Sequence, residues 1–128
     1  MHERTRYVVN GHNCTSLAAT AEEFTRALKL TMPWRGNFDA FNDILNGGFG
    51  TPDDGFELVW ERSDAARVGL GYRETIKWLE ERSTHAHPSN RDDFLERLAA
   101  AKSGAGPTLF DTLTEIIRDH EDIELRLV

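Results

Sequence analysis

Three short runs of apolar and β-branched residues are separated by longer segments with helical periodicity. The runs cover residues 6–9, 56–60 and 123–128, and the first ends at the turn dipeptide Asn10-Gly11. Runs of this length and composition are typical of β-strands. The second run is apolar at most positions, which indicates a strand that is mostly buried. We therefore expect three strands.

Five segments between these strands place apolar residues at helical spacing. Ser16 and Asn37 are suitable caps for helices over residues 17–30 and 38–46. Further helices are expected over residues 72–82, 90–102 and 108–120, the fourth opening with a capping box of Ser89 and Asp92. Strands that alternate with helices favour parallel pairing, because a parallel link needs a crossover. The pattern predicts an α/β fold class: a small three-stranded parallel sheet packed by helices.

Length and composition fit one soluble domain over residues 1–128. The chain has one cysteine, Cys14, which excludes an internal disulfide framework and fits a reducing cytoplasm. No apolar stretch is long enough for a signal peptide or a membrane span. The formal net charge of −7 argues against direct binding of nucleic acid, which depends on Lys and Arg. We expect a cytoplasmic protein with no membrane and no nucleic-acid partner.

The excess negative charge is confined to two segments. Residues 36–61 hold six acidic residues and no Lys or Arg, and residues 107–128 hold six acidic residues and two arginines. If the two segments meet in space, they form an anionic surface with a long-range field. The alternative interpretation is a solvated, solubilising surface.

The helix expected over residues 38–46 places two of these acidic residues on its outward side. Its apolar residues fall on one arc at 100° per residue, whereas Asp39 and Asp43 share a ridge well away from that arc. Two like charges four residues apart destabilise an isolated helix by some tenths of a kcal/mol. Asp111, Glu115 and Asp119 form a similar ridge on the last helix. Both ridges are therefore candidates for binding a cationic partner.

An enzyme is the competing hypothesis, with Asp39, Asp43 and Glu115 as oxygen ligands of a metal-dependent hydrolase. The sequence contains no recognisable metal motif, and His85 and His87 offer two ligands where zinc needs three or four. Ridge carboxylates also stand in solvent instead of in a pocket. We expect no catalytic residue, no metal site and no cofactor.

The acidic helix also carries a family resemblance. Residues 8–11 read VVNG, residues 36–45 read GNFDAFNDIL, residues 57–61 read ELVWE, and residues 115–127 continue as a helix and a strand without a gap. In these segments the chain resembles the barstar family, the intracellular inhibitors of secreted bacterial ribonucleases such as barnase. The resemblance covers roughly residues 5–62 and 107–128, and it implies the same three-stranded parallel fold.

The resemblance also implies a mechanism, in which acidic side chains plug the ribonuclease active site where substrate phosphates would sit. By position, Asp39 and Asp43 match the two key aspartates of the family, and Glu115 matches the glutamate of its last helix. Further contact positions of the family fall on Trp34, Asn37, Phe38, Asn42 and Gly47.

Two departures from the family pattern stand out. Asn42 replaces a tryptophan between the aspartates, and residues 63–106 form a much longer link, which we expect to be an extra helical insertion. The resemblance implies an immunity-type protein inhibitor, not an enzyme. Its partner would be a secreted or toxin ribonuclease of the barnase kind with a basic active site, and the inhibitor would be monomeric until complexed.

Overall fold

A three-stranded sheet forms the centre of the molecule in a computed structural model, which describes residues 4–128. Its strands are β1 (Arg6–Asn10), β2 (Phe56–Glu61) and β3 (Ile123–Leu127), in the order β1-β2-β3. Both pairs are parallel, with Val8 opposite Val59 and Val59 opposite Arg126. The predicted fold class, α/β with a three-stranded parallel sheet, is confirmed.

Six α-helices and one short 3-10 helix connect the strands. They are η1 (Gly11–Asn13), α1 (Leu17–Ala27), α2 (Phe38–Leu45), α3 (Ser63–Gly69), α4 (Tyr72–His85), α5 (Pro88–Lys102) and α6 (Leu109–Arg118). Residues 63–106, the expected helical insertion, contain α3, α4 and α5.

Four of these elements differ from the sequence prediction, and one of them is α4, which runs to His85 instead of ending at residue 82. Helix α3 was not predicted, because its N-cap residue Arg62 has a left-handed conformation and makes no side-chain capping bond. Helix α1 ends at Ala27 instead of near residue 30, since Lys29 has a positive φ of 52° that a helix cannot continue through. Helix α5 begins at Pro88, and the ring of His87, not the hydroxyl of Ser89, accepts the capping hydrogen bond.

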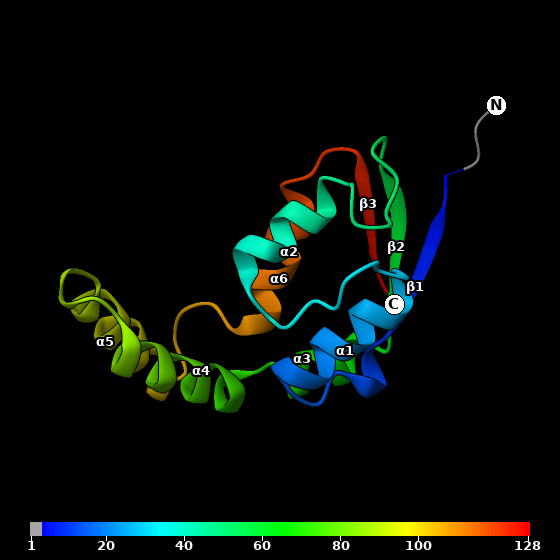
Figure 1. Cartoon of the computed structure of the whole chain (residues 1–128). Coiled ribbons are helices and arrows are strands. Elements are labelled where there is room, and N and C mark those ends of the chain that lie inside the picture. The colour runs from blue at the N-terminus through cyan, green and yellow to red at the C-terminus, as the bar shows by residue number, and fades with distance from the viewer. Residues whose placement is uncertain (1–3) are drawn as a thin grey trace.

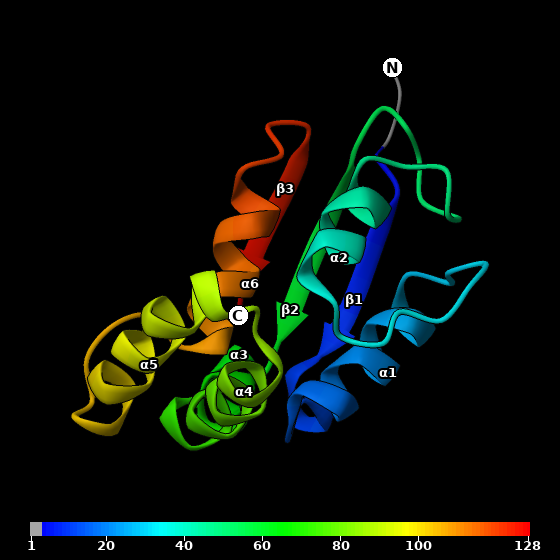
Figure 2. The ribbon, with the colours of Figure 1, turned by 60° about the vertical axis from the view of Figure 1, so that its left-hand side comes forward.

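The main core lies between one face of the sheet and the helices α1, α2 and α6, which gather on that face (Figures 1 and 2). Alternate residues of β2 point into it, and Trp60 is fully buried beside Phe24 and Phe110, with ring centroids 5.2 and 5.0 Å away. The period of two along β2 therefore decides which side of the sheet the helices cover.

Charged residues occupy the opposite face of the sheet. Glu57 at its centre accepts hydrogen bonds from Arg126 of β3 (3.2 Å) and Arg6 of β1 (3.1 Å). These two partners hold the pKa of Glu57 below its ordinary value. One acid of the segment 36–61 is thus neutralised on the far face, and it adds nothing to an anionic surface on the helical face.

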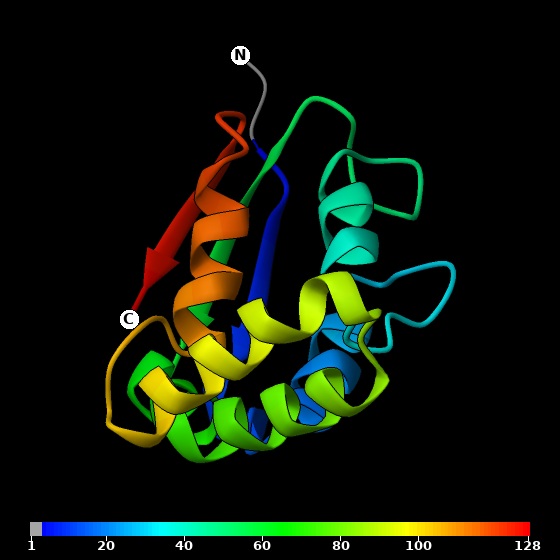
Figure 3. The ribbon, with the colours of Figure 1, turned by 90° about the vertical axis from the view of Figure 1, so that its left-hand side faces the viewer.

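Helices α4 and α5 form a hairpin that projects from the base of the sheet, below α2 and α6 (Figures 1 and 3). A small core of its own joins the two helices, built from Leu79, Leu98 and Ala101. The hairpin is fixed to α6 by the Thr75 hydroxyl, which accepts a hydrogen bond from the Leu109 N–H at 2.9 Å. None of the helices within residues 4–128 has the length and apolar character that crossing a membrane requires.

Candidate protein-binding site

Helix α2 presents its two aspartates to solvent. The Asn37 side chain caps the helix by accepting a hydrogen bond from the Ala40 N–H at 2.9 Å, which fixes where the first turn begins. Phe41 and Ile44 are buried on the sheet side, whereas Asp39 and Asp43 on the outer side are exposed. Asp39 lies in the first turn, where the partial positive charge of the helix N-terminus stabilises a carboxylate.

Gly47 follows the end of α2 and has a left-handed backbone conformation that favours glycine. Its φ is +102°, and a Cβ at this position would lie 2.3 Å from Oδ1 of Asp53. The Gly47 N–H donates to the carbonyl of Ile44 at 3.1 Å, so the chain turns away directly after the helix. The position therefore determines the path of the loop beside Asp43.

Helix α6 lies beside α2 and brings the second acidic segment to the same face (Figure 3). Nε2 of His120, just after α6, and Oδ1 of Asn42 on α2 are 2.8 Å apart and share a hydrogen bond. Glu115 is exposed on α6. Two segments far apart in the sequence thus meet, and we call Asp39, Asp43 and Glu115 the acidic face.

Within the described part of the chain, the carboxylates of the acidic face have no cationic partner. Among residues 4–128, no Lys, Arg or His nitrogen lies within 4.0 Å of Asp39, Asp43 or Glu115, although other acids such as Glu57 are paired. Exposed carboxylates of this kind interact with an incoming cation without first breaking an internal ion pair.

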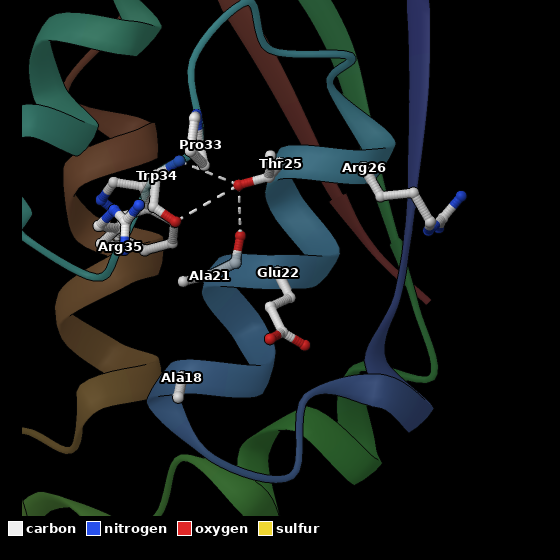
Figure 4. A pocket seen from close by; sticks show the side chains of 8 residues that line it. All are labelled: Ala18, Ala21, Glu22, Thr25, Arg26, Pro33, Trp34 and Arg35. Carbon is white, nitrogen blue, oxygen red and sulfur yellow. Dashed lines mark hydrogen bonds between the residues drawn. The ribbon is translucent and has the colours of Figure 1, made fainter.

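Trp34 is placed in the core, not on the surface that the resemblance implied. Its side chain is 3% exposed and stacks on Phe41, with ring centroids 4.6 Å apart. Its Nε1–H donates to the Asn37 carbonyl at 2.7 Å, and its backbone N–H donates to Thr25 Oγ1 at 3.0 Å, the latter drawn in Figure 4. Trp34 therefore positions the start of α2. Its burial does not support the direct contact with a partner that the resemblance implied.

Two residues of this region were missed by the sequence analysis. Trp78 of α4 packs against Phe38, with ring centroids 5.2 Å apart, and this contact leaves Phe38 half-buried between α2 and the hairpin. His120 fixes Asn42. Trp78 falls within a helix that was predicted, but periodicity does not reveal which neighbour a helix meets.

The hydrolase hypothesis needs several carboxylates gathered around one metal ion. The part of the chain that the structure describes contains no group of three or more His, Cys, Asp or Glu side chains that could hold a metal ion. Cys14 is fully buried, and burial raises the pKa of its thiol, which disfavours the reactive thiolate.

Comparisons with known proteins bear on the family of the chain. A search of curated proteins gives no match. A family model described as Barstar (barnase inhibitor) matches residues 5–93, which is more than half of the chain and includes β1, α2 and β2. The match extends through α3 and α4 into the first part of α5, beyond the first segment in which the resemblance was expected. It does not reach the second expected segment, residues 107–128, which contains Glu115. The chain belongs to the barstar family.

Proposed function

We propose that this protein inhibits a barnase-type ribonuclease by placing its acidic face over the catalytic cleft of the enzyme. The observation that carries the proposal is the acidic face itself: three exposed, unpaired carboxylates on two adjacent helices of a barstar-family chain. The cleft of a ribonuclease must stabilise the negative charge that develops on a phosphate, so it is lined with cations. Asp39, Asp43 and Glu115 take the places of phosphate groups and exclude RNA.

The rigidity of the support is part of the mechanism. Asn37 caps α2, Trp34 holds the Asn37 carbonyl, and Asn42 is tied to α6 through His120. A surface that is ordered before binding loses less conformational entropy in the complex. Asn37, Phe38, Asn42 and Gly47 surround the carboxylates and form the rest of the contact in this proposal. The inhibitor acts in the cytoplasm as a monomer that pairs with one nuclease.

The direct test is an RNA-cleavage assay with a panel of purified barnase-type ribonucleases, barnase among them. We expect stoichiometric inhibition of at least one enzyme as the protein is titrated in. If no enzyme of the panel is inhibited, the proposed function is wrong.

The contribution of Asp43 gives a sharper test on the inhibited enzyme. Asp43→Ala would leave cations of the enzyme buried and unpaired, so we expect the complex to weaken by about 2–5 kcal/mol. Asp53→Ala removes an exposed carboxylate from the adjacent loop and should change mainly the association rate. Calorimetry that shows small and equal losses for both variants would contradict the assignment.

A further inference from the structure

A groove lies where the α4–α5 hairpin meets α6, and the family mechanism does not use it. Its volume is about 480 Å³, and it opens at the base of α6. Its walls come from all three helices and include Trp78, Leu79, Arg97, Ala100, Leu109 and Glu115.

The groove is continuous with the acidic face. Glu115 belongs to both, because it lines the groove and also stands on the exposed side of α6. On the other side, Trp78 lines the groove and packs against Phe38 of α2 at 5.2 Å. The hairpin projects beyond α2 and α6 (Figures 1 and 3), so a protein seated on the acidic face lies next to the hairpin.

Apart from Glu115 at its edge, the charged and hydroxyl side chains that line the groove already have partners. The Thr75 hydroxyl donates to the Gly71 carbonyl at 2.8 Å and accepts from the Leu109 N–H, and the Thr112 hydroxyl donates to the Thr108 carbonyl at 3.1 Å. Arg97 is paired with Asp93 at 3.3 Å. A polar ligand would find few free partners here, whereas an apolar side chain would gain by removing the walls from water.

The charge of the chain favours a foreign protein over a second copy. A copy docked in the groove would bring a chain of net charge −7 against the acidic face of its partner, and like charges across an interface are unfavourable. A ribonuclease with a basic cleft has the opposite charge and is held in place by the neighbouring carboxylates.

We propose that one apolar side chain from the rim of the bound ribonuclease enters this groove, so that the α4–α5 hairpin is a second contact site beside the acidic face. The inference rests on the proposed function and adds a selective element to it: ribonucleases that lack an apolar residue at this place bind more weakly. The acidic face attracts the enzyme and anchors it, and the groove further lengthens the life of the complex.

Ala100→Leu tests the proposal by filling the groove from within. Ala100 lines the groove, whereas its neighbour Ala99 is exposed on α5 and is absent from the lining, so Ala99→Leu is the matched control. The probe is a catalytically inactive variant of whichever barnase-type ribonuclease the wild-type protein inhibits. Surface plasmon resonance should show dissociation at least about tenfold faster for Ala100→Leu with an association rate within about twofold of wild type, since interface changes act mainly on dissociation. Ala99→Leu should leave both rates unchanged.

Several results would overturn this inference. Wild-type dissociation rates for Ala100→Leu, or equal effects of both substitutions, would show that nothing enters the groove, while inhibition by the wild-type protein would still support the proposed function. Sedimentation that shows a dimer broken by Ala100→Leu would identify a second copy as the occupant.

If thermal unfolding shows that Ala100→Leu does not fold, Ala100→Met replaces it, because the unbranched side chain adapts to irregular space. If the wild-type protein inhibits no ribonuclease, this inference fails together with the proposed function.

Discussion

Glu23 shows how a single carboxylate can hold several backbone segments together. Its side chain is 3% exposed and accepts hydrogen bonds from the Asn10 N–H at 2.7 Å, Asn13 Nδ2 at 3.2 Å and Arg26 Nε at 2.9 Å. Burial by itself raises the pKa of Glu23, but these hydrogen bonds outweigh burial and leave the pKa below its ordinary value. The carboxylate thus joins the end of β1 and η1 to α1.

Glu23→Gln should destabilise the fold in a pH-dependent manner. Because the folded-state pKa is lowered, the carboxylate stabilises the protein above its unfolded-state pKa of about 4.3, and this stabilisation is lost as pH falls through the folded-state pKa. We expect a loss of about 1–3 kcal/mol at pH 7, the range for hydrogen bonds to a charged group, and a smaller loss as the pH falls below about 4. Urea unfolding of the wild-type protein and of Glu23→Gln from pH 3 to pH 8 measures this difference in the free energy of unfolding.

The exposed neighbour Glu22 provides the control for this experiment. Glu22→Gln should change stability little at any pH. A loss for Glu23→Gln that is the same across the whole pH range would show that shape, not charge, is responsible.

Single residues of the site were predictable only where a regular element fixes their direction. The outward position of Asp39 and Asp43 follows from helical geometry once Phe41 and Ile44 are assigned to the core. Trp34 lies in a loop, where sequence gives no side-chain direction, and the structure places it in the core. The bond between Asn42 and His120 joins residues 78 positions apart, which no local pattern reveals.

The junction of α4 and α6 is the element contact that holds the hairpin in place. The Leu109 N–H is the first of α6 and has no acceptor within its own helix, so it donates to Thr75 Oγ1 instead. Thr75 is 3% exposed, so this hydrogen bond is largely shielded from water. The position of the groove wall depends on this bond.

Thr75→Val should therefore destabilise the protein by about 1–3 kcal/mol, because it leaves a buried N–H group without an acceptor while preserving the side-chain shape. Thr84→Val is the matched control on the same helix, since the Thr84 hydroxyl is exposed and donates only to the Glu80 carbonyl. Thermal or urea unfolding compares the two variants, and equal stabilities would mean that the bond to Leu109 adds nothing.

A side-chain cap made the start of a helix predictable, and a helix without one was predicted only where its apolar periodicity was long enough, as in α4. Ser16, Asn37 and Thr108 accept hydrogen bonds at the starts of α1, α2 and α6, where the sequence placed these helices. Helix α3 has seven residues and no side-chain cap, so its start carries no local signal. The parallel sheet followed from the order of strands and helices, whereas the placement of the hairpin depends on tertiary contacts.

The whole molecule carries its charges unevenly. The far face of the sheet is balanced by ion pairs around Glu57, and the helical face holds the unpaired carboxylates of α2 and α6. A net charge of −7 with this distribution produces a negative electrostatic potential that is strongest on one side of the molecule. An approaching basic protein is oriented by that field before contact.

Association with the ribonuclease should accordingly slow as salt is added. The screening length falls from about 30 Å at 0.01 M to about 8 Å at 0.15 M ionic strength, so long-range attraction is largely removed. We expect the association rate to fall by at least about tenfold over this range, with a smaller change in dissociation. Stopped-flow mixing measures the rate, and an association rate that is independent of salt would rule out electrostatic steering.

The parallel sheet adds its strands in chain order, and this order has a consequence for biosynthesis. Asn42 leaves the ribosome 78 residues before His120, a delay of about 4–16 s at ~5–20 residues per second. During this interval the nascent chain displays the aspartates of α2 without the glutamate or the supporting histidine from the end of α6. A translation product that stops before residue 115 therefore lacks one of the three carboxylates of the acidic face, and under the proposed function only finished copies would inhibit the enzyme fully.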